Sequence, residues 1–230
     1  MPVTCVFRDT PNEVVSAVAE QIASQIDSII TTAGECVLAL AGGSTPAPSY
    51  RALSRLDIDW AKVHFVQTDE RVIGEVAERS ARLIETAFGL DHRELRARWH
   101  PVVVHGDGAR TAAAYADRLA TVRPGGVPDI AILGLGVDGH TASIFNHNLD
   151  TDTSAAVVST VYRGEERVSL GLEYLRAIPT RVVLATGASK RAALGSVLRP
   201  AAGTPRVPAA VVLGEDGYVF ADAAARPEWS

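Results

Sequence analysis

A histidine in a glycine-rich segment is the side chain of this sequence best suited to acid–base chemistry. His140 closes the segment GLGVDGH, residues 134–140, which follows an apolar run. Imidazole exchanges protons near neutral pH, and Asp138, two residues earlier, could fix its tautomer and stabilise the imidazolium. A lone histidine is more often a helix cap or a packed core residue. The glycines around His140 reverse that preference, and we predict a general base.

The same segment also matches the dinucleotide-binding pattern G-x-G-x-x-G through Gly134, Gly136 and Gly139. That pattern is weak alone and needs an acidic residue about 20 positions on, at the end of the next strand. The next apolar run, 155–160, ends without one, and only a short helix is expected from Thr141. The sequence therefore argues against a nicotinamide cofactor, and we expect no cofactor.

A second loop, AGGSTP, contains Gly42, Gly43, Ser44, Thr45 and Pro46 after another apolar run. Glycines allow close approach of a ligand to the backbone, and either hydroxyl could cap a helix whose first turn holds the proline. The N–H groups at such a positive helix end can bind phosphate. An ordinary strand-to-helix turn with a good cap would have the same sequence, so both interpretations stay open.

Charged residues supply the remaining candidates. Asp69, Glu70 and Arg71 follow Thr68 at the end of the expected strand in KVHFVQ, and Arg71 could clamp a phosphate while the acids orient it or bind sugar hydroxyls. A solvated loop with a local ion pair is the simpler alternative for three adjacent charges. Lys190 stands in the first turn of an expected helix, where a cation is unfavourable unless an anion binds nearby. Arg167 begins an expected strand and could reach the same edge.

Neither the other histidines nor the cysteines form a metal-binding pattern. No H-x-x-x-H or clustered carboxylate spacing suggests a metal site, so we expect none. Cys5 and Cys36 both lie in apolar runs. We expect buried, reduced thiols there, since a disulfide would require their two strands to be neighbours.

The elements that must position these loops follow from hydrophobic periodicity. Short apolar runs alternate with amphipathic ones, which predicts an α/β fold with a mostly parallel sheet covered by helices on both faces. Strands are expected over 3–7, 35–41, 63–67, 102–104, 129–133, 167–170, 182–185 and 207–213, with an edge hairpin over 217–220. Helices are expected over 12–31, from Pro46, over 77–88, 110–121 and 189–198, and briefly from Thr141. Residues 148–163 are expected to form a flap or a surface loop. Ligands bind at the carboxyl ends of strands in such sheets, where the polar loops would meet.

Length and composition indicate one domain spanning residues 1–230. The formal net charge of −5 gives no general attraction to nucleic acid or to an anionic membrane. No apolar run is long enough to cross a bilayer, and the first residues, MPVTCVFRDT, lack the features of a signal peptide. We therefore expect a cytoplasmic protein with a small-molecule substrate, either a monomer or a weak homodimer.

Four segments together resemble a known family. LALAGGSTP, FVQTDERVI, DIAILGLGVDGHTASIF and TGASK, in this order, are similar to the 6-phosphogluconolactonases and, more distantly, to the glucosamine-6-phosphate deaminases and isomerases. The resemblance covers nearly the whole chain, and DGHTASIF is its most specific part. It implies a Rossmann-like three-layer sandwich of the sugar-phosphate isomerase/lactonase type. It also implies hydrolysis of 6-phospho-D-glucono-1,5-lactone to 6-phosphogluconate, in the oxidative branch of the pentose phosphate pathway.

The resemblance also implies roles for the candidate residues. It makes His140 the base, supported by Asp138, with Asp69 and Glu70 near the sugar. The phosphate would be held by Gly43, Ser44, Thr45, Arg71 and Lys190, and we add Gly42, Gly139 and Arg167 as candidate substrate contacts. The chemistry fits independently, because water deprotonated by an imidazole can attack a lactone, which is an activated ester. Backbone N–H groups of the glycine loops could stabilise the oxyanion.

The chain departs from the family pattern at a few positions. Ile73-Gly74 replaces the usual Val-Pro, Ala81 an asparagine, and Asn146-His147 a Pro-Gly pair. The isomerases and deaminases carry a glutamate five residues after the histidine, whereas Phe145 stands here and cannot move protons. A sugar-phosphate sensor, the other alternative, would need a DNA-binding module and would be expected to lose His140. Hydrolysis is favoured.

Overall fold

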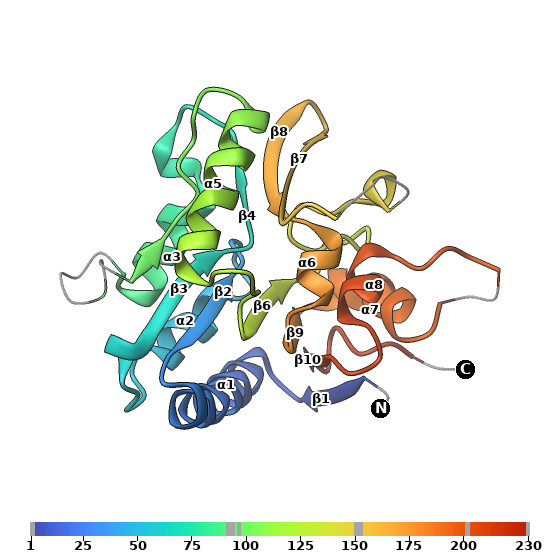
Figure 1. The fold of residues 1–230 in the computed structure, drawn as a ribbon. Coiled ribbons are helices and arrows are strands. Elements are labelled where there is room, and N and C mark those ends of the chain that lie inside the picture. The colour runs from blue at the N-terminus through green and yellow to red at the C-terminus, as the bar shows by residue number, and fades with distance from the viewer. Residues whose placement is uncertain (1–2, 91–94, 96–97, 150–153, 201–202, 229–230) are drawn as a thin grey trace.

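Figure 1 shows two sheets of unequal size with helices packed around them. The computed structural model describes residues 3–90, 95, 98–149, 154–200 and 203–228. In these ranges seven parallel strands form the main sheet, in the order β1-β10-β9-β6-β2-β3-β5, and a small antiparallel sheet has the order β4-β8-β7. The strands are β1 (Thr4–Arg8), β2 (Cys36–Leu40), β3 (Val63–Gln67), β4 (Asp69–Arg71), β5 (Trp99–His100), β6 (Ile130–Gly134), β7 (Val157–Tyr162), β8 (Glu165–Leu170), β9 (Thr180–Ala185) and β10 (Tyr218–Asp222).

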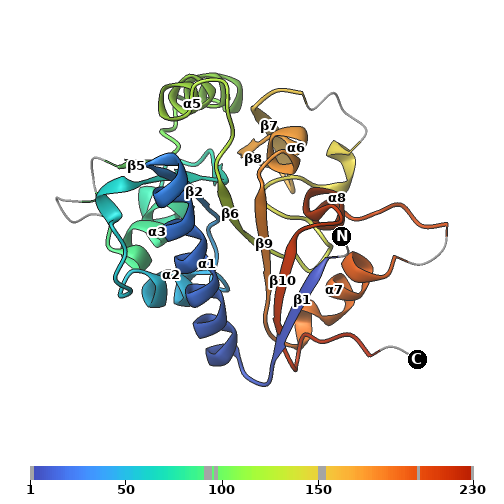
Figure 2. The same cartoon turned by 60° about the horizontal axis from the view of Figure 1, so that its bottom comes forward.

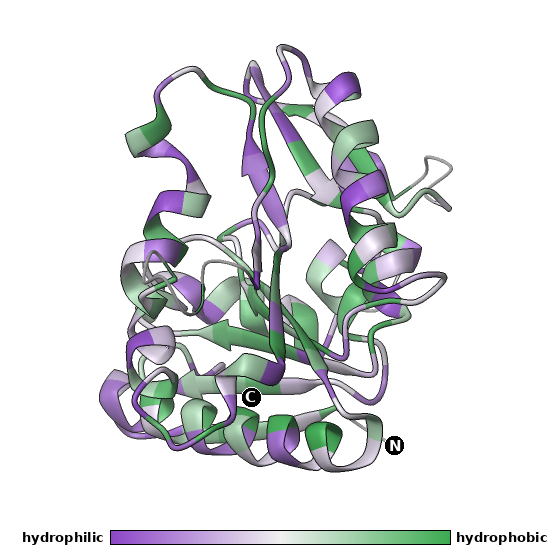
Figure 3. Cartoon of the chain, turned by 60° about the vertical axis from the view of Figure 1, so that its left-hand side comes forward, coloured by the Kyte–Doolittle hydropathy of each residue, from purple (hydrophilic) through white to green (hydrophobic). Residues whose placement is uncertain are grey.

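Helices cover both faces of the main sheet, which confirms the predicted α/β architecture. One core joins the sheet to α1, α2 and α3, and a second joins its other face to α5, α6, α7 and α8. The helices are α1 (Pro11–Ala33), α2 (Ala47–Leu53), α3 (Ser80–Phe88), α5 (Gly108–Val122), α6 (Leu172–Arg176), α7 (Arg191–Leu198) and α8 (Pro208–Leu213). Figure 3 shows apolar residues concentrated along the strands and on the helix faces turned toward them.

Strand β2 illustrates why these segments form a buried sheet. All five residues of CVLAL are buried, and successive side chains point to opposite faces. Leu38 and Leu40 enter the core under α1, while Val37 and Ala39 enter the other. A strand covered on both sides needs apolar residues at every position, so it reads as a continuous apolar run.

Strand order brings the polar loops together. β9, β6, β2 and β3 are consecutive neighbours in the main sheet, and all run parallel. The segments that follow them contain, respectively, Lys190, His140, Ser44 and Asp69. The small sheet stands at the same end of the molecule, with β7 against α5 (Figure 1). Four segments far apart in sequence therefore meet at one edge, as predicted.

Two segments near the C-terminus correct the sequence prediction. The expected strand 207–213 is helix α8, with Pro208 in its first turn. A short apolar run does not distinguish a strand from a buried helix, and a proline at the first helical position decides for the helix. The expected edge hairpin 217–220 is instead β10, a parallel strand between β1 and β9 (Figure 2).

Other predictions in the middle of the chain are also corrected. No strand covers 102–104, because the pairing with β3 is made earlier, at Trp99–His100. No helix begins at Thr141, which forms an isolated bridge with Ile144. Within 148–163, residues 150–153 lie outside the described part, while 157–162 are strand β7 rather than a flap or a loop. The predicted strand 167–170 exists as β8, but it is antiparallel and belongs to the small sheet.

The cysteines were predicted correctly in one case only. Cys36 is buried, whereas Cys5 is exposed on edge strand β1. Both thiols are free, and three strands separate β1 from β2 in the sheet. A disulfide between them is therefore excluded by the topology.

Candidate active site

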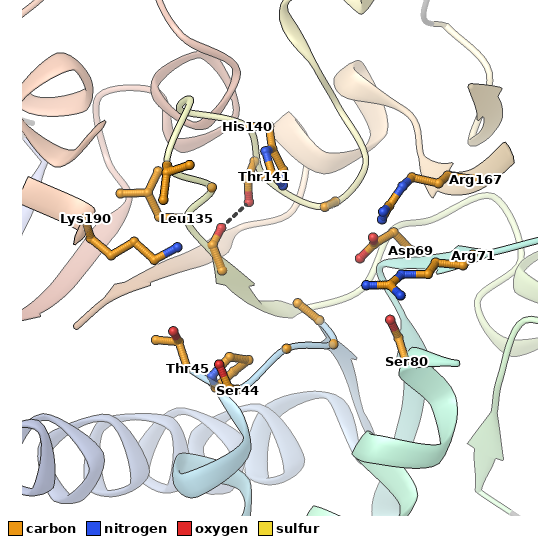
Figure 4. A pocket seen from close by; sticks show the side chains of 18 residues that line it. Ser44, Thr45, Asp69, Arg71, Ser80, Leu135, His140, Thr141, Arg167 and Lys190 are labelled. Atoms are coloured by element: carbon orange, nitrogen blue, oxygen red, sulfur yellow. Dashed lines mark hydrogen bonds between the residues drawn. The ribbon is translucent and has the colours of Figure 1, made fainter. Parts of the chain in front are cut away.

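A cavity of about 370 Å³ opens where the four parallel strands end (Figure 4). It is lined by residues 41–46 after β2, Asp69 and Arg71 on β4, Ser80 on α3, residues 134–137 and 140–142 after β6, Arg167 on β8 and Lys190 after β9. Most candidates from the sequence are in this set: Gly42, Gly43, Ser44, Thr45, Asp69, Arg71, His140, Arg167 and Lys190. The cavity combines hydroxyl, carboxylate, imidazole and cationic groups.

His140 forms a hydrogen-bonded chain with two other side chains. Its Nδ1 lies 2.5 Å from Oδ1 of Asp138, and Oδ2 of the same carboxylate accepts a 2.8 Å hydrogen bond from the Tyr162 hydroxyl. Burial raises the pKa of Asp138, but hydrogen bonds from Tyr162 and His140 outweigh this and lower it to about 2. An ionised Asp138 keeps the proton of a neutral His140 on Nδ1. Nε2, which has no partner among the described residues, is then free to accept a proton.

The shape of the loop depends on a glycine beside this chain. A Cβ atom at Gly136 would collide with the His140 ring and with the Asp138 carboxylate. The Gly136 N–H donates to the backbone oxygen of His140 at 2.8 Å, which closes the loop. The glycine-rich segment thus serves to bring the backbone against the imidazole, rather than against a dinucleotide.

Two aromatic rings, of Phe145 and Tyr162, lie beside the imidazole of His140. The Phe145 and Tyr162 rings are stacked, with centroids 3.9 Å apart and planes 3° from parallel. The Phe145 ring is 4.8 Å from the His140 ring, and Phe145 is buried. Tyr162 was not among the predicted site residues, because it lies in the stretch 148–163, where a flap or a surface loop was expected.

Three cations face the cavity with few or no anionic partners. The side chains of Arg71 and Lys190 make no hydrogen bond or ion pair within the described residues. They enter the cavity from opposite sides in Figure 4. Arg167 pairs with Glu165 at 2.9 Å, but its Nε is buried without a partner. The DER run therefore contains no local ion pair at Arg71, contrary to the simpler alternative. Unpaired cations around one cavity favour an anionic ligand.

The loop after β2 presents its backbone to the same space. The N–H groups of residues 42–45 have no hydrogen-bond partner in the described ranges, and Gly43 has a φ of 106°. The prediction that Ser44 or Thr45 caps the next helix is wrong: α2 starts after Pro46 and has no side-chain cap. Both hydroxyl residues line the cavity instead. Donors left free in this way suit the oxygens of a phosphate.

Asp69 and Glu70 have different surroundings. Asp69 lines the cavity, and its carboxylate accepts hydrogen bonds from the Ser143 hydroxyl at 2.8 Å and the Thr68 hydroxyl at 3.0 Å. Glu70 is fully buried outside the cavity, so its expected place near the sugar is wrong. Its carboxylate accepts three backbone N–H groups, from Arg71, Ser80 and Ala81, each at 2.8 Å.

Gly139 is the other predicted substrate contact that does not line the cavity. It is buried with a φ of 86°, and a Cβ atom there would collide with Val207. Its carbonyl accepts the N–H of Ala209, which ties the loop to α8. Ser80, by contrast, lines the cavity although it was not among the predicted site residues.

Neither a metal cluster nor a membrane span is found in the described ranges. No group of three or more His, Cys, Asp or Glu side chains there could hold a metal ion. No helix of the described part is long and apolar enough to cross a membrane. The chemistry available at the cavity is thus an oriented imidazole with a free nitrogen, beside donors for an anion.

Comparison with known proteins agrees with this geometry. The sequence model of the family described as glucosamine-6-phosphate isomerases/6-phosphogluconolactonase matches residues 9–221. The chain belongs to this family.

Relatives within the family are similar over most of their length. A 6-phosphogluconolactonase of Synechocystis sp. is 32% identical over 197 residues, which cover 82% of each chain. One of Mesorhizobium japonicum is 32% identical over 229 residues, covering 96% of this chain and 91% of the relative. The crystal structure of 6-phosphogluconolactonase from Thermotoga maritima, 24% identical, superposes with a TM-score of 0.84 over 96% of this chain and 99% of its own. That structure confirms the family fold.

Proposed function

We propose that this family member hydrolyses 6-phospho-D-glucono-1,5-lactone to 6-phosphogluconate, with His140 activating the water. The relatives that are 32% identical are both named 6-phosphogluconolactonase. The observation that carries the proposal is the free Nε2 of His140, held beside a cavity with unpaired cations. A small sugar phosphate made and consumed by cytoplasmic metabolism is the substrate, with no nucleic acid or membrane partner and no cofactor.

The substrate phosphate would lie above the loop of residues 42–45. Lys190 and Arg71 point into the cavity from opposite sides (Figure 4), so both contribute positive charge that attracts an anion bound there. Free N–H groups and the hydroxyls of Ser44 and Thr45 supply further donors. Anchoring the phosphate fixes the lactone carbon relative to His140, which lowers the entropic part of the barrier.

Proton transfer then follows from the hydrogen-bonded chain. Nε2 of His140 takes a proton from water as the oxygen attacks the lactone carbonyl, and Asp138 stabilises the imidazolium that results. Ring opening returns a proton to the leaving hydroxyl, so no covalent enzyme intermediate is needed. Backbone N–H groups of the glycine loops are the available donors for the oxyanion. Asp69 and Arg167 face the sugar from the side of the small sheet.

Isomerisation or deamination on the same scaffold is disfavoured by Phe145. A ring-opening isomerase needs a second proton carrier beside the histidine, and the group whose ring lies 4.8 Å from His140 is a phenyl ring. A sensor without activity is disfavoured because Asp138 and Tyr162 hold His140 ready to accept a proton. Both alternatives predict no lactonase activity above the spontaneous rate.

The test is acid release from freshly made 6-phosphogluconolactone, recorded above spontaneous hydrolysis. We expect the wild type to accelerate hydrolysis strongly, and His140→Asn to lose about 10²- to 10⁴-fold in kcat, as for other general bases. The variant should keep the wild-type circular dichroism spectrum and bind 6-phosphogluconate with similar affinity. Glucosamine 6-phosphate is the control substrate and should not be turned over. A wild type no faster than solvent, or a fully active His140→Asn, would disprove the proposal.

A further inference from the structure

A second cavity, of about 330 Å³, lies beside β5, the edge strand of the main sheet. It is lined by Trp99, His100, Pro101, Val103, His105, Ala114, Tyr115 and Arg118. Its volume is at the lower end of the range for small-molecule sites. Among these residues three are basic and none is acidic. None of them lines the first cavity.

Two histidines connect this cavity to the interior. His100 is only 4% exposed, and its Nε2 lies 2.9 Å from Nδ1 of His64 on β3. An arginine caps each end of the pair: Arg98 approaches Nε2 of His64 at 2.6 Å, and Arg118 approaches Nδ1 of His100 at 2.7 Å. Burial, followed by the nearby Arg118, lowers the pKa of His100 to about 4, and burial lowers that of His64 too. Both rings are therefore neutral at physiological pH.

The row Arg98–His64–His100–Arg118 has one hydrogen-bond donor too many when both histidines are neutral. Arginine only donates, and a neutral imidazole has one N–H and one acceptor nitrogen. If Arg98 donates to Nε2 of His64, the proton of His64 is on Nδ1 and points to Nε2 of His100. The proton of His100 is then on Nδ1 and faces a donor of Arg118. If Arg118 instead donates to Nδ1 of His100, the protons lie on Nε2 of both rings, and Nε2–H of His64 faces a donor of Arg98. Two neutral rings therefore cannot accept hydrogen bonds from both arginines.

The donor–donor contact is more easily relieved at Arg118, next to the cavity, than at Arg98. At the opposite end of the pair, Arg98 is held beside His64 by a second partner, since its Nη1 also donates to Glu35 at 2.7 Å. Arg118 is exposed and has no carboxylate partner in the described part of the chain. Its guanidinium can therefore move aside, and an acceptor placed between it and His100 would receive a hydrogen bond from each.

We propose that this cavity binds a phosphate group, with the Arg118 guanidinium and the Nδ1–H of His100 as its donors. A phosphate oxygen accepts from both, which removes the donor–donor contact, and its charge compensates a guanidinium that has no acid beside it. The indole of Trp99 and the side chains of Pro101 and Val103 would contact the carbon atoms of a phosphate ester. The ligand is inorganic phosphate or a small phosphate monoester, and the site is independent of the reaction at His140.

Nitrogen NMR of the full chain, labelled with ¹⁵N in its histidine rings, tests the site. The protein is titrated with inorganic phosphate and, separately, with glycerol 3-phosphate at constant ionic strength. We expect the ring nitrogens of His64 and His100 to shift together and to saturate. Those of His140 report binding in the first cavity separately. Tighter binding of the ester indicates that the apolar wall is used, and equal binding indicates free phosphate as the ligand.

Two variants on the same helix provide the comparison. Arg118→Gln should weaken the response of His100 at least about tenfold, because one charge-assisted hydrogen bond is lost, and should leave lactonase kcat/KM unchanged. Arg110→Gln removes an exposed arginine of α5 whose partner is Asp107, and should leave the response unchanged. Shifts at His64 and His100 that grow without saturating, or that persist with equal affinity in Arg118→Gln, would overturn the proposal.

Discussion

At the scale of single residues, the site depends on a carboxylate that two side chains share. One carboxylate oxygen of Asp138 accepts a hydrogen bond from His140, and the other accepts one from the Tyr162 hydroxyl. The first pair could be predicted because its residues are two positions apart in a glycine-rich loop. The second could not, because Tyr162 is 24 residues away from Asp138 on a strand of the small sheet. Contacts between distant segments depend on topology, which local patterns do not contain.

Removing the tyrosine hydroxyl should slow the chemical step without weakening binding. In Tyr162→Phe the stacked ring stays, while Asp138 loses a hydrogen bond and the position of His140 becomes less fixed. A hydrogen bond to a charged group contributes about 1.5 kcal/mol, so kcat should fall roughly tenfold with KM unchanged. Steady-state lactone hydrolysis measures both constants.

The matched control is Tyr174→Phe. Its hydroxyl donates to the backbone oxygen of Gly126 at 3.1 Å, and it lines neither cavity. It should leave kcat as in the wild type. An unchanged kcat in Tyr162→Phe, or a rise in KM alone, would show that the hydroxyl does not position the base.

Lys190 should contribute to substrate binding rather than to the chemical step. In Lys190→Ala the cavity loses one of its unpaired cations, so KM should rise at least about tenfold while kcat changes little. The other lysine of the chain provides the control: Lys62 pairs with Asp59 at 3.3 Å on the surface, and Lys62→Ala should behave as the wild type. A KM equal in both variants would place the phosphate elsewhere.

At the scale of elements, strong periodicity predicted the fold and failed for short apolar runs. The 23-residue helix α1 has a capping box at Thr10 and Glu13 and a clear apolar stripe, so its prediction was secure. The run 207–213 is too short to show a period, and tertiary packing decided that it forms a helix. Glu70 was assigned to the site because it stands between Asp69 and Arg71, which both line the cavity. Only the fold shows that Glu70 itself is buried outside the cavity.

The buried carboxylate of Glu70 should stabilise the start of α3. It accepts the N–H groups of Ser80 and Ala81, and Gln67 donates to it as well at 2.8 Å. In Glu70→Gln an amide NH₂ would face at least one of these donors. We expect a loss of about 2 kcal/mol in the free energy of unfolding, or roughly 4–8 °C in Tm. Ser80 lines the cavity, so KM should rise as well.

Thermal and urea unfolding measure the effect. Glu78→Gln, which changes an exposed glutamate in the turn before the same helix, is the control and should leave Tm unchanged. Equal stability of the two variants would mean that Glu70 does not hold the helix. The family's usual asparagine is Ala81 here, and its backbone N–H still reaches Glu70. This departure therefore leaves the anchor of α3 intact.

At the scale of the whole molecule, the sequence predicted the position of the site at the sheet edge, but not the contacts between residues far apart in the chain. Polar loops after buried parallel strands must meet at one sheet edge, and nine of the predicted residues line the first cavity there. The His64–His100 pair could not be predicted, because these residues are 36 positions apart and neither stands in a distinctive motif. The pair forms only when β5 docks beside β3, and this docking gives the folded chain a specific sensitivity to acid.

Stability should fall between about pH 6.5 and pH 4. The folded pKa of His100 is about 4, below the value of roughly 6.5 expected when unfolded, so the unfolded chain takes up protons first. The stabilisation is complete above pH 6.5 and is lost as the pH falls toward 4, by about 2–3 kcal/mol for this group; the lowered pKa of His64 acts in the same direction. Asp138, whose pKa is lowered to about 2, stabilises the folded chain above about pH 4, and this contribution is lost only as the pH falls below that value. Urea unfolding at pH 7.5, 6.5, 5.5 and 4.5 should show this slope, and His100→Gln should flatten it even if its absolute stability is lower. An identical slope in the variant would mean that other groups cause the acid sensitivity.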